Sequence, residues 1–177
     1  GAELHHEAEV VVALGALPER RPGDLREARS WIAAIGLGLD LTMRDVQRAL
    51  KAKGLPWERA KAFDGAAPIG ALALCPPDLD LGALHFEARV DGARRQHGDT
   101  ALMLFSIPTL VLALSEVWQL QAGDLIFTGT PAGVGPLHSG EQGIVQQRGG
   151  AVRPHAAGIG AGVARSHLLV ILRGVEH

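Results

Sequence analysis

Two glutamates separated by one residue interrupt an apolar strand near the start of the chain. The stretch LHHEAEVVVALG alternates well enough to predict a strand over residues 7–14, with Glu7 and Glu9 on one face. Side chains at i and i+2 of a strand lie about 7 Å apart, so two buried carboxylates there would repel each other and lose hydration. Either the pair faces water on an edge strand, or a cation between them offsets the cost.

A third acid, Asp40, favours the explanation that a cation binds between the glutamates. Residues 32–41, IAAIGLGLDL, predict a buried strand, and Asp40 lies at its end, where functional side chains often collect. Asp40 could simply begin the turn into the next helix, but Thr42 fills the predicted capping position of that helix, which leaves Asp40 for another role. Carboxylate oxygens suit Mg²⁺, Mn²⁺ or Ca²⁺ better than zinc. Glu7, Glu9 and Asp40 are therefore candidate ligands of one divalent cation.

Composition limits the class of protein. The 177 residues are 47% hydrophobic, enough for one domain with a sizeable core. With 17 basic against 19 acidic residues, the charge gives no general attraction to nucleic acid or to an anionic membrane. No apolar run reaches the about 18 residues of a membrane span, and the N-terminus does not resemble a signal peptide. Cys75 is the single cysteine, so an internal disulfide is excluded and a reducing cytoplasm is the simplest compartment.

Further elements follow from turn and periodicity signals. Asp91-Gly92 between two extended runs predicts a β-hairpin. Residues 107–118 carry apolar side chains at helical spacing, and Ser106 and Pro108 suit the first turn of that helix.

The end of the chain shows neither the helical nor the strand period. After Gly135 only residues 167–172, HLLVIL, predict a strand. GIGAGVA at 158–164 resembles a dinucleotide-binding loop weakly, but no strand precedes it and no acid follows at the required distance, so we reject that interpretation. We therefore divide the chain into a catalytic core, 1–137, and a C-terminal tail, 138–177, to which we assign no structure.

Five motifs in order and near-register resemble the fumarylacetoacetate hydrolase family over residues 3–137: LHHEAEVVVALG, GLGLDLTMRDVQ, KAFDGAAPIG, DTALMLFSIP and GDLIFTGTPAGVG. The resemblance implies an α+β fold that is mostly β, a mixed β-sandwich roll with a few short helices. It implies bound Mg²⁺ or Mn²⁺, with Ca²⁺ also compatible, and hydrolysis of a carbon–carbon bond in acylpyruvates or related β-diketo acids. Some members decarboxylate oxaloacetate instead. It also implies a cytoplasmic homodimer whose ligand is a small keto acid.

The resemblance assigns the metal to the same three acids and implies that Lys61 and Thr130 are catalytic residues. It assigns substrate binding to Arg44, Gln47 and Thr130. Arg44 and Gln47 would face the substrate. Lys61 would hydrogen-bond a developing oxyanion, and Thr130, with the amides of the glycine-rich loop, would hold a carboxylate. Taken alone, the charged stretch around Lys61 predicts a solvated lysine, and GTPAGVG predicts a plain turn; it is no nucleotide-binding P-loop, because no Gly-Lys-Ser/Thr follows.

The resemblance also places a lid with a water-activating His and Glu pair upstream of the first acid motif. Because the chain begins at Gly1, we expect that general base to lie outside it. The alternative to a hydrolase is therefore a non-catalytic domain that binds a divalent cation and a keto acid. A purely structural β-domain would require all five motifs to be coincidental.

Overall fold

Three antiparallel sheets form the framework of the chain in the computed structural model, which describes residues 3–147 and 157–158. The first sheet has the order β5-β3-β2-β8, formed by Ala73–Leu74, Ile32–Leu39, Ala8–Leu14 and Leu125–Phe127 respectively. The longest ladder in this sheet joins β2 to β3. β2 is therefore a central strand, with β3 on one side and β8 on the other.

Both faces of β2 are buried, which excludes the exposed edge strand as an explanation of the glutamates. Val10 and Val12 point into the main hydrophobic core, while Glu9 and Val11 lie on the opposite face and are equally enclosed. Glu9 is only 3% exposed. The predicted strand over residues 7–14 is confirmed except at its first residue, since β2 begins at Ala8.

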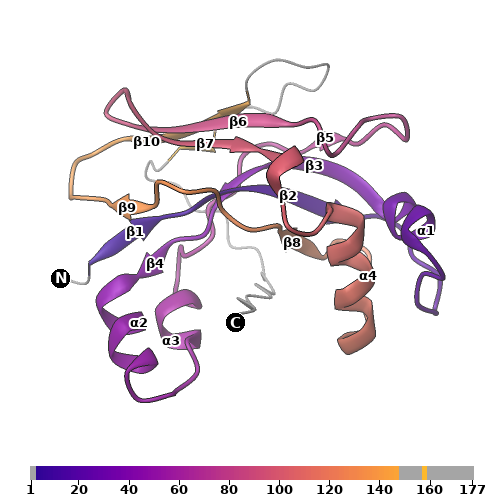
Figure 1. The fold of residues 1–177 in the computed structure, drawn as a ribbon, viewed down its shortest axis with the longest axis horizontal. Helices are drawn as coiled ribbons and strands as arrows, with labels where there is room; N and C mark the ends of the chain where they lie inside the picture. The colour runs from indigo at the N-terminus through magenta and orange to yellow at the C-terminus, as the bar shows by residue number, and fades with distance from the viewer. Residues whose placement is uncertain (1–2, 148–156, 159–177) are drawn as a thin grey trace.

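A second sheet lies over the first, as Figure 1 shows, with β6 and β7 above β2 and β3. Its order is β11-β10-β6-β7, formed by Ala157–Gly158, Gly143–Gln147, His85–Val90 and Ala93–Asp99 respectively. Apolar side chains from the facing surfaces of both sheets belong to one hydrophobic core. This burial holds the two sheets together.

The hairpin of this sheet turns at the predicted residues. Val90 pairs with Ala93, so Asp91 and Gly92 form a two-residue loop, and both have positive φ angles, 48° and 77°. Positive φ at both central positions is the geometry of a type I′ turn, which matches the twist of the flanking strands.

The second sheet also corrects our interpretation of the tail. We expected no strand between residue 138 and residue 166, yet β10 pairs with β6 along its whole length. The open edge of β6 supplies the backbone partners, so a weakly alternating segment becomes a strand through tertiary pairing. The predicted strand at residues 167–172 lies outside the described residues. A boundary after residue 137 stays a prediction.

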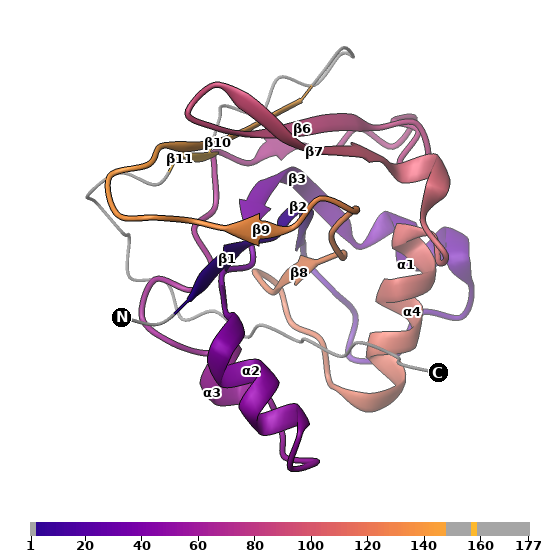
Figure 2. The ribbon, with the colours of Figure 1, turned by 60° about the vertical axis from the view of Figure 1, so that its left-hand side comes forward.

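The third sheet is small and contains β1, the strand that leads into Glu7 and β2. Its order is β4-β1-β9, formed by Thr42–Met43, Leu4–His6 and Gly135–Pro136. Figure 2 shows β1 beside β9 and leading into β2. Only Glu7 separates β1 from β2, so this glutamate lies where the chain passes from one sheet into the next.

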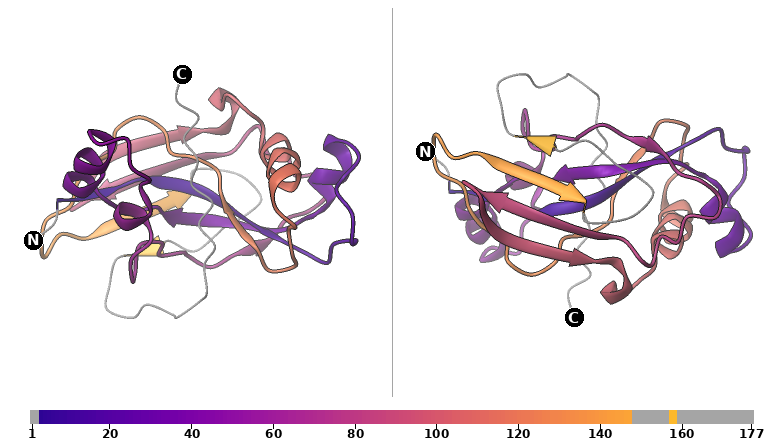
Figure 3. Two further views of the ribbon diagram at one scale, coloured as in Figure 1. Left: turned by 90° about the horizontal axis from the view of Figure 1, so that it is seen from below. Right: turned by 90° about the horizontal axis from the view of Figure 1, so that it is seen from above.

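Helices cover the two ends of the sheets. α1 (Leu25–Ser30) packs against α4 (Ile107–Val117) at one end, and α2 (Arg44–Lys51) packs against α3 (Glu58–Lys61) at the other (Figures 1 and 3). A short 3₁₀ turn, Thr100–Leu102, follows β7. Among the described residues, no helix is both long and apolar enough to cross a bilayer.

The helix caps confirm one prediction and correct another. The Ser106 hydroxyl accepts a hydrogen bond from the Thr109 amide at the start of α4, and a proline lies in the first turn, as predicted. Thr42, however, does not cap α2: the N-cap is Met43, which makes no side-chain cap hydrogen bond. Thr42 lies in β4, and its hydroxyl instead donates to Glu7 Oε1 at 3.0 Å. The elements as a whole confirm the predicted α+β, mostly β fold.

Candidate metal centre

The three acids that the sequence singled out converge. Glu7, Glu9 and Asp40 are all buried, and each offers a carboxylate oxygen within 4.8 Å of the oxygens of the other two. The β2–β3 register explains the convergence, because Ala8 lies opposite Leu39 and the Asp40 amide donates to the Glu7 carbonyl at 2.8 Å. The end of β3 is thereby placed beside the two glutamates. The predicted geometry is confirmed, whereas the role of metal ligand stays a prediction.

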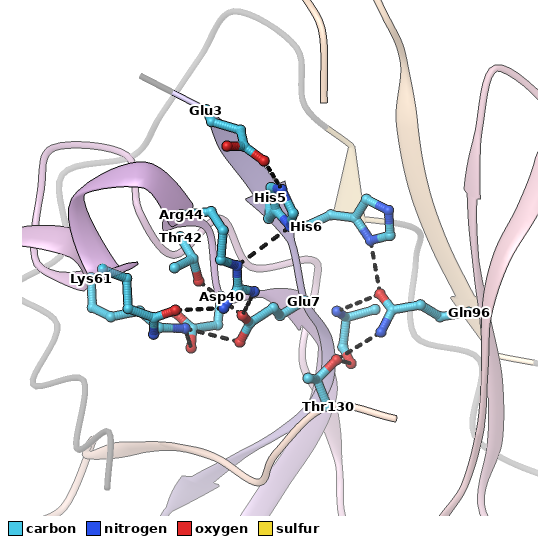
Figure 4. A network of polar contacts seen from close by, with 12 residues as sticks. Glu3, His5, His6, Glu7, Asp40, Thr42, Arg44, Lys61, Gln96 and Thr130 are labelled. Carbon is cyan, nitrogen blue, oxygen red and sulfur yellow. Dashed lines mark hydrogen bonds and ion pairs between the residues drawn. The ribbon is translucent and has the colours of Figure 1, made fainter. Parts of the chain in front are cut away.

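Two cationic side chains come from the helices at this end of the sheets. Lys61, at the end of α3, donates from Nζ to Glu7 Oε2 at 2.9 Å and to Asp40 Oδ2 at 2.6 Å. Arg44, at the start of α2, donates from Nη2 to Glu7 Oε1 at 2.5 Å. Figure 4 shows the lysine reaching Glu7 and Asp40, and the arginine reaching Glu7. Lys61 is only 7% exposed, so the solvated lysine that its surroundings alone predict is wrong.

The donor set and its geometry fit a hard divalent cation. Asp40 Oδ1 is buried and is the one such side-chain oxygen or nitrogen for which the described residues provide no hydrogen-bond partner. A buried carboxylate oxygen without a partner is costly, and coordination of a cation removes that cost. Among the described residues, Lys61 and Arg44 are the bases that contact these acids, so the three carboxylates, when all are ionised, exceed the bases by one negative charge. A divalent cation would compensate it.

The carboxyl groups differ in how well their charge is compensated. Burial, with a contribution from the charge of Asp40, raises the pKa of Glu9 to about 8. Burial raises the pKa of Asp40 to about 6 although the Lys61 ammonium opposes the shift. Burial, the largest single influence on Glu7, acts to raise its pKa, but Lys61, Thr42 and Arg44 together outweigh it and hold the pKa of Glu7 below its usual value. Glu9 is thus the acid that most needs further positive charge in order to ionise.

The glycine-rich loop after β8 contacts the cluster through its backbone. The Gly129 amide donates to Glu9 Oε2 at 2.7 Å, and Gly129 has a φ of 100°, which favours glycine. The Thr130 hydroxyl donates to the Ala8 carbonyl at 2.9 Å and not to a carboxylate of the cluster. Its role in substrate binding stays a prediction.

Arg44 also orients the predicted substrate residue Gln47. Arg44 Nη1 donates to Gln47 Oε1 at 2.5 Å, and Arg44 Nε faces His5 Nδ1 at 3.4 Å. His5 in turn bonds Glu3 at 2.8 Å. Gln47, Arg44 and Lys61 therefore lie around the acids as the motifs imply, while their catalytic and binding roles stay predictions.

The sequence interpretation missed Gln96, a buried residue that contacts His6. Gln96, on β7, is 1% exposed, and its Oε1 accepts from His6 Nδ1 at 2.9 Å and from the Ala8 amide at 3.0 Å. The polar strand ARRQHGD offers only a weak signal for Gln96, because alternation places it on the same face as Arg94, which is exposed.

Sequence comparison places the chain in a family. Residues 1–165 match the family described as fumarylacetoacetate (FAA) hydrolase, C-terminal. The chain belongs to this family. The fumarylacetoacetate hydrolase assignment agrees with the fold and with the positions of the five motifs.

Members of the fumarylacetoacetate hydrolase family with curated names include two tautomerases. The mitochondrial oxaloacetate tautomerase FAHD1 of Mus musculus is 42% identical over 151 residues, which cover 82% of this chain and 67% of that protein. The oxaloacetate tautomerase YcgM of Escherichia coli is 42% identical over 140 residues, covering 78% of this chain and 63% of that protein. The chain thus spans about two thirds of the length of these curated relatives.

A solved structure of the family shares the fold. Fumarylpyruvate hydrolase from Pseudomonas aeruginosa, in complex with Mn²⁺ and pyruvate, superposes with a TM-score of 0.76 at 36% identity and covers 82% of this chain and 61% of that chain.

Proposed function

We propose that the chain is the metal-binding core of an enzyme that acts on a small 2-oxo acid through its enolate. The observation that carries the proposal is the convergence of three buried carboxylates, one of which, Asp40, has an oxygen without a hydrogen-bond partner among the described residues. Buried, incompletely compensated acids beside a lysine are typical of functional sites and are costly in a merely structural role.

Glu7, Glu9 and Asp40 would hold the cation. Three carboxylates without histidine or cysteine favour Mg²⁺ or Mn²⁺, and Ca²⁺ is compatible. The Pseudomonas aeruginosa relative, which binds Mn²⁺, supports the same choice. When bound, the cation would supply positive charge that polarises the carbonyl of the keto acid and stabilises negative charge on its oxygen.

Lys61 and Arg44 each keep hydrogen-bond donors for a substrate. Lys61 uses two of its three N–H groups on Glu7 and Asp40, so the third can donate to the developing enolate oxygen. Arg44 uses three of its five donors, and the remaining N–H groups can bind the substrate carboxylate. The Gly129 amide orients Glu9 by donating to its Oε2.

We propose cleavage of the carbon–carbon bond of an acylpyruvate as the reaction. Water adds to the acyl carbonyl, the bond to the methylene carbon breaks, and its electron pair forms the enolate of pyruvate, which takes up a proton at carbon. The second product is a carboxylic acid. Lys61 would donate a hydrogen bond to the enolate oxygen as its charge develops. The fumarylpyruvate hydrolase relative supports this reaction.

Interconversion of the keto and enol forms of oxaloacetate is a second candidate, which the two tautomerase relatives favour. Both forms share one enolate, which carries a proton on its oxygen in the enol form and on the carbon next to the carbonyl carbon in the keto form. No water is consumed. Decarboxylation of oxaloacetate would pass through the corresponding enolate of pyruvate. The homodimer and the cytoplasmic location stay predictions, and the mouse relative is mitochondrial.

A side-by-side assay tests the proposal. The 177-residue chain is incubated with acetylpyruvate and with enol-oxaloacetate, with Mn²⁺ or with a chelator, and enol absorbance and pyruvate release are followed. We expect metal-dependent turnover of at least one substrate, with enol-oxaloacetate favoured because its conversion consumes no water. This turnover should be lost in Asp40→Asn and kept in Glu58→Gln, which changes an exposed acid on α3. Turnover that survives chelation or Asp40→Asn would contradict the proposal. Mn²⁺ binding without turnover of either substrate would favour the non-catalytic alternative.

A further inference from the structure

Among the described strands, none pairs with Ala8, the residue between the two glutamates, on the side opposite β3. β8 pairs with β2 only from Val11 onward, Thr128 extends this contact to the Val10 carbonyl, and β9 pairs with β1 no further than His6. β8 ends at Phe127, and Gly129, two residues later, has a φ of 100°. On this side, Ala8 therefore lies in the gap between β9 and β8, and neither strand offers a backbone hydrogen-bond partner to its N–H and C=O.

Side chains fill this gap in the ladder. The Ala8 amide donates to Gln96 Oε1 at 3.0 Å, and the Thr130 hydroxyl donates to the Ala8 carbonyl at 2.9 Å. Gln96 Nε2 then donates to Thr130 Oγ1 at 2.8 Å, which closes a ring of hydrogen bonds around Ala8. Figure 4 shows Gln96 between His6 and Thr130.

The amide of Gln96 is fully used. Its oxygen accepts from His6 and Ala8, and its nitrogen donates to Thr130 and to the Pro131 carbonyl at 2.9 Å. A primary amide has two donors and two acceptor sites, so each one is matched. Such a buried, saturated amide fixes the positions of its partners, since a shift of any one breaks a buried hydrogen bond.

The glycine-rich loop is shaped to lie against Gln96. Gly133 has a φ of 98°, and a Cβ there would lie 2.2 Å from the Arg95 carbonyl oxygen and 3.3 Å from Gln96 Cγ. Only glycine allows the loop to approach the β7 backbone so closely. Gln96 is therefore the point where the second sheet, the loop and the glutamate-bearing strand meet.

We propose that Gln96 is a positioning residue for the metal centre. By holding Ala8 and Thr130 at a set distance, it aims the flanking Glu7 and Glu9 at the same point as Asp40 and keeps the Gly129 amide on Glu9. Gln96 itself touches none of the three carboxylates among the described contacts. The inference rests on the proposed metal binding.

The test uses two substitutions of Gln96 and one matched control in the full chain. Gln96→Met removes every hydrogen bond at similar length, and Gln96→Glu keeps an acceptor oxygen but loses the amide donors to Thr130 and Pro131. Thr100→Val is the control, because Thr100 is also buried, directly after β7, and its hydroxyl accepts from the Leu84 amide at 2.9 Å and makes no described hydrogen bond to the acids or to Ala8. Mn²⁺ affinity is measured by titration calorimetry, and melting temperature by circular dichroism.

We expect Mn²⁺ to bind about 10–100-fold more weakly to Gln96→Met, the usual effect of removing a residue that orients metal ligands. Gln96→Glu should also bind at least about tenfold more weakly, and it decides the question if Gln96→Met does not fold. Thr100→Val should melt earlier but bind Mn²⁺ within about twofold of the original chain, as distant sites act independently. Unchanged affinity in a folded Gln96 variant, or an equal loss in Thr100→Val, overturns the proposal.

Absence of Mn²⁺ binding by the original chain would refute the proposed function rather than the role of Gln96. Amide hydrogen exchange then tests the positioning directly. The Ala8 amide should exchange faster in the Gln96 variants and at the original rate in Thr100→Val. Equal exchange at Ala8 in all three variants would show that Gln96 does not hold this backbone.

Discussion

At the scale of single residues, positive charge is unevenly distributed over the three acids. Lys61 contacts Glu7 and Asp40, and Arg44 contacts Glu7, whereas the described residues give Glu9 one hydrogen bond, from the Gly129 amide. Glu9 is also the acid with the most strongly raised pKa. A bound cation would therefore change the ionisation of Glu9 most, because there it replaces a proton.

The raised pKa of Glu9 predicts pH-dependent metal binding. Below pH 8 the metal-free folded protein holds a proton on Glu9, because the pKa is about 8. A cation must displace this proton, so apparent Mn²⁺ affinity should rise by up to about tenfold per pH unit from pH 7 to pH 8 and level off above. Titration calorimetry in two buffers of different ionisation enthalpy counts the protons released.

Glu9→Gln is the control for this prediction. The variant cannot release a proton at position 9, so its weaker Mn²⁺ binding should show almost no pH dependence above pH 7, where Asp40, with a pKa of about 6, is already ionised. A pH slope in Glu9→Gln equal to that of the original chain would assign the proton to another group.

Lys61→Ala should abolish turnover while Mn²⁺ affinity changes only a few fold. The ammonium is the donor placed to bind the developing oxyanion, but it is a neighbour of the acids and not one of the three candidate ligands. Its removal takes away both a competing cation and a group that orients Glu7 and Asp40, and these two effects on affinity oppose each other. Steady-state kinetics and calorimetry measure the two quantities.

Lys53→Ala, an exposed lysine after α2, is the matched control and should behave like the original chain. Undiminished turnover in Lys61→Ala would remove Lys61 from the catalytic proposal.

At the scale of elements, the site forms where the ends of several strands and one helix lie close together. Glu7 lies between β1 and β2, Asp40 lies between β3 and β4, and Lys61 ends α3. The glycine-rich loop then closes the centre from the side of β8. The loop lies directly on β7 at Gly133, where there is no room for a Cβ atom. A side chain at this position should therefore disturb the structure more than one at a turn glycine exposed to solvent.

Gly133→Ala should therefore destabilise the chain strongly. A methyl group there combines a positive φ, which costs about 1–2 kcal/mol, with a clash against the Arg95 carbonyl oxygen. Gly123→Ala is the control, since Gly123 also has a positive φ, 89°, but an added Cβ would meet no atom within 4 Å. Chemical denaturation should show a clearly larger loss for Gly133→Ala. Equal losses would mean that the loop can move away from β7.

Local sequence patterns predicted the elements whose formation depends on residues that are close in the sequence. Alternation found β2, the Asp91-Gly92 signal found the hairpin, and Ser106 marked the start of α4. Thr42 was misassigned because a threonine before a helix suits both a helix cap and a β-strand. Its hydroxyl donates to the buried Glu7 carboxylate, which favours the position in β4 over a capping role. β10 was missed because its partner strand, β6, is distant in sequence.

The candidate site shows the same division between motif and tertiary contact. The acids could be named because glutamates on an apolar strand conflict with its pattern, and the family resemblance added Lys61 and Arg44. Local sequence around Lys61 argued for solvent, since its burial arises from packing of α3 on β4 and on the acids. Gln96 could not be found, because its partners lie 34 to 90 residues away in the chain.

At the scale of the whole molecule, the candidate metal centre lies where parts that are otherwise held together by apolar packing meet. The β2 and β3 strands enter the main core, whereas β1, β4 and the two helices beside them lie at one end of the sheets (Figure 1). Three buried acids at this junction oppose folding in the absence of a cation, because their desolvation is only partly compensated. Cation binding and folding should therefore be thermodynamically linked.

Mn²⁺ should accordingly raise the melting temperature of the chain, and a chelator should reverse the effect. A ligand that binds only the folded state at 100 times its dissociation constant adds about 2.7 kcal/mol of stability. For a domain of this size each kcal/mol corresponds to about 2–4 °C, so we expect a rise of about 5–10 °C, measured by circular dichroism. Glu9→Gln should lose most of the rise, and Glu58→Gln, with its acid in solvent, should keep it. If Mn²⁺ shifts Glu9→Gln as much as the original chain, the cation binds elsewhere and the three converging acids are not its site.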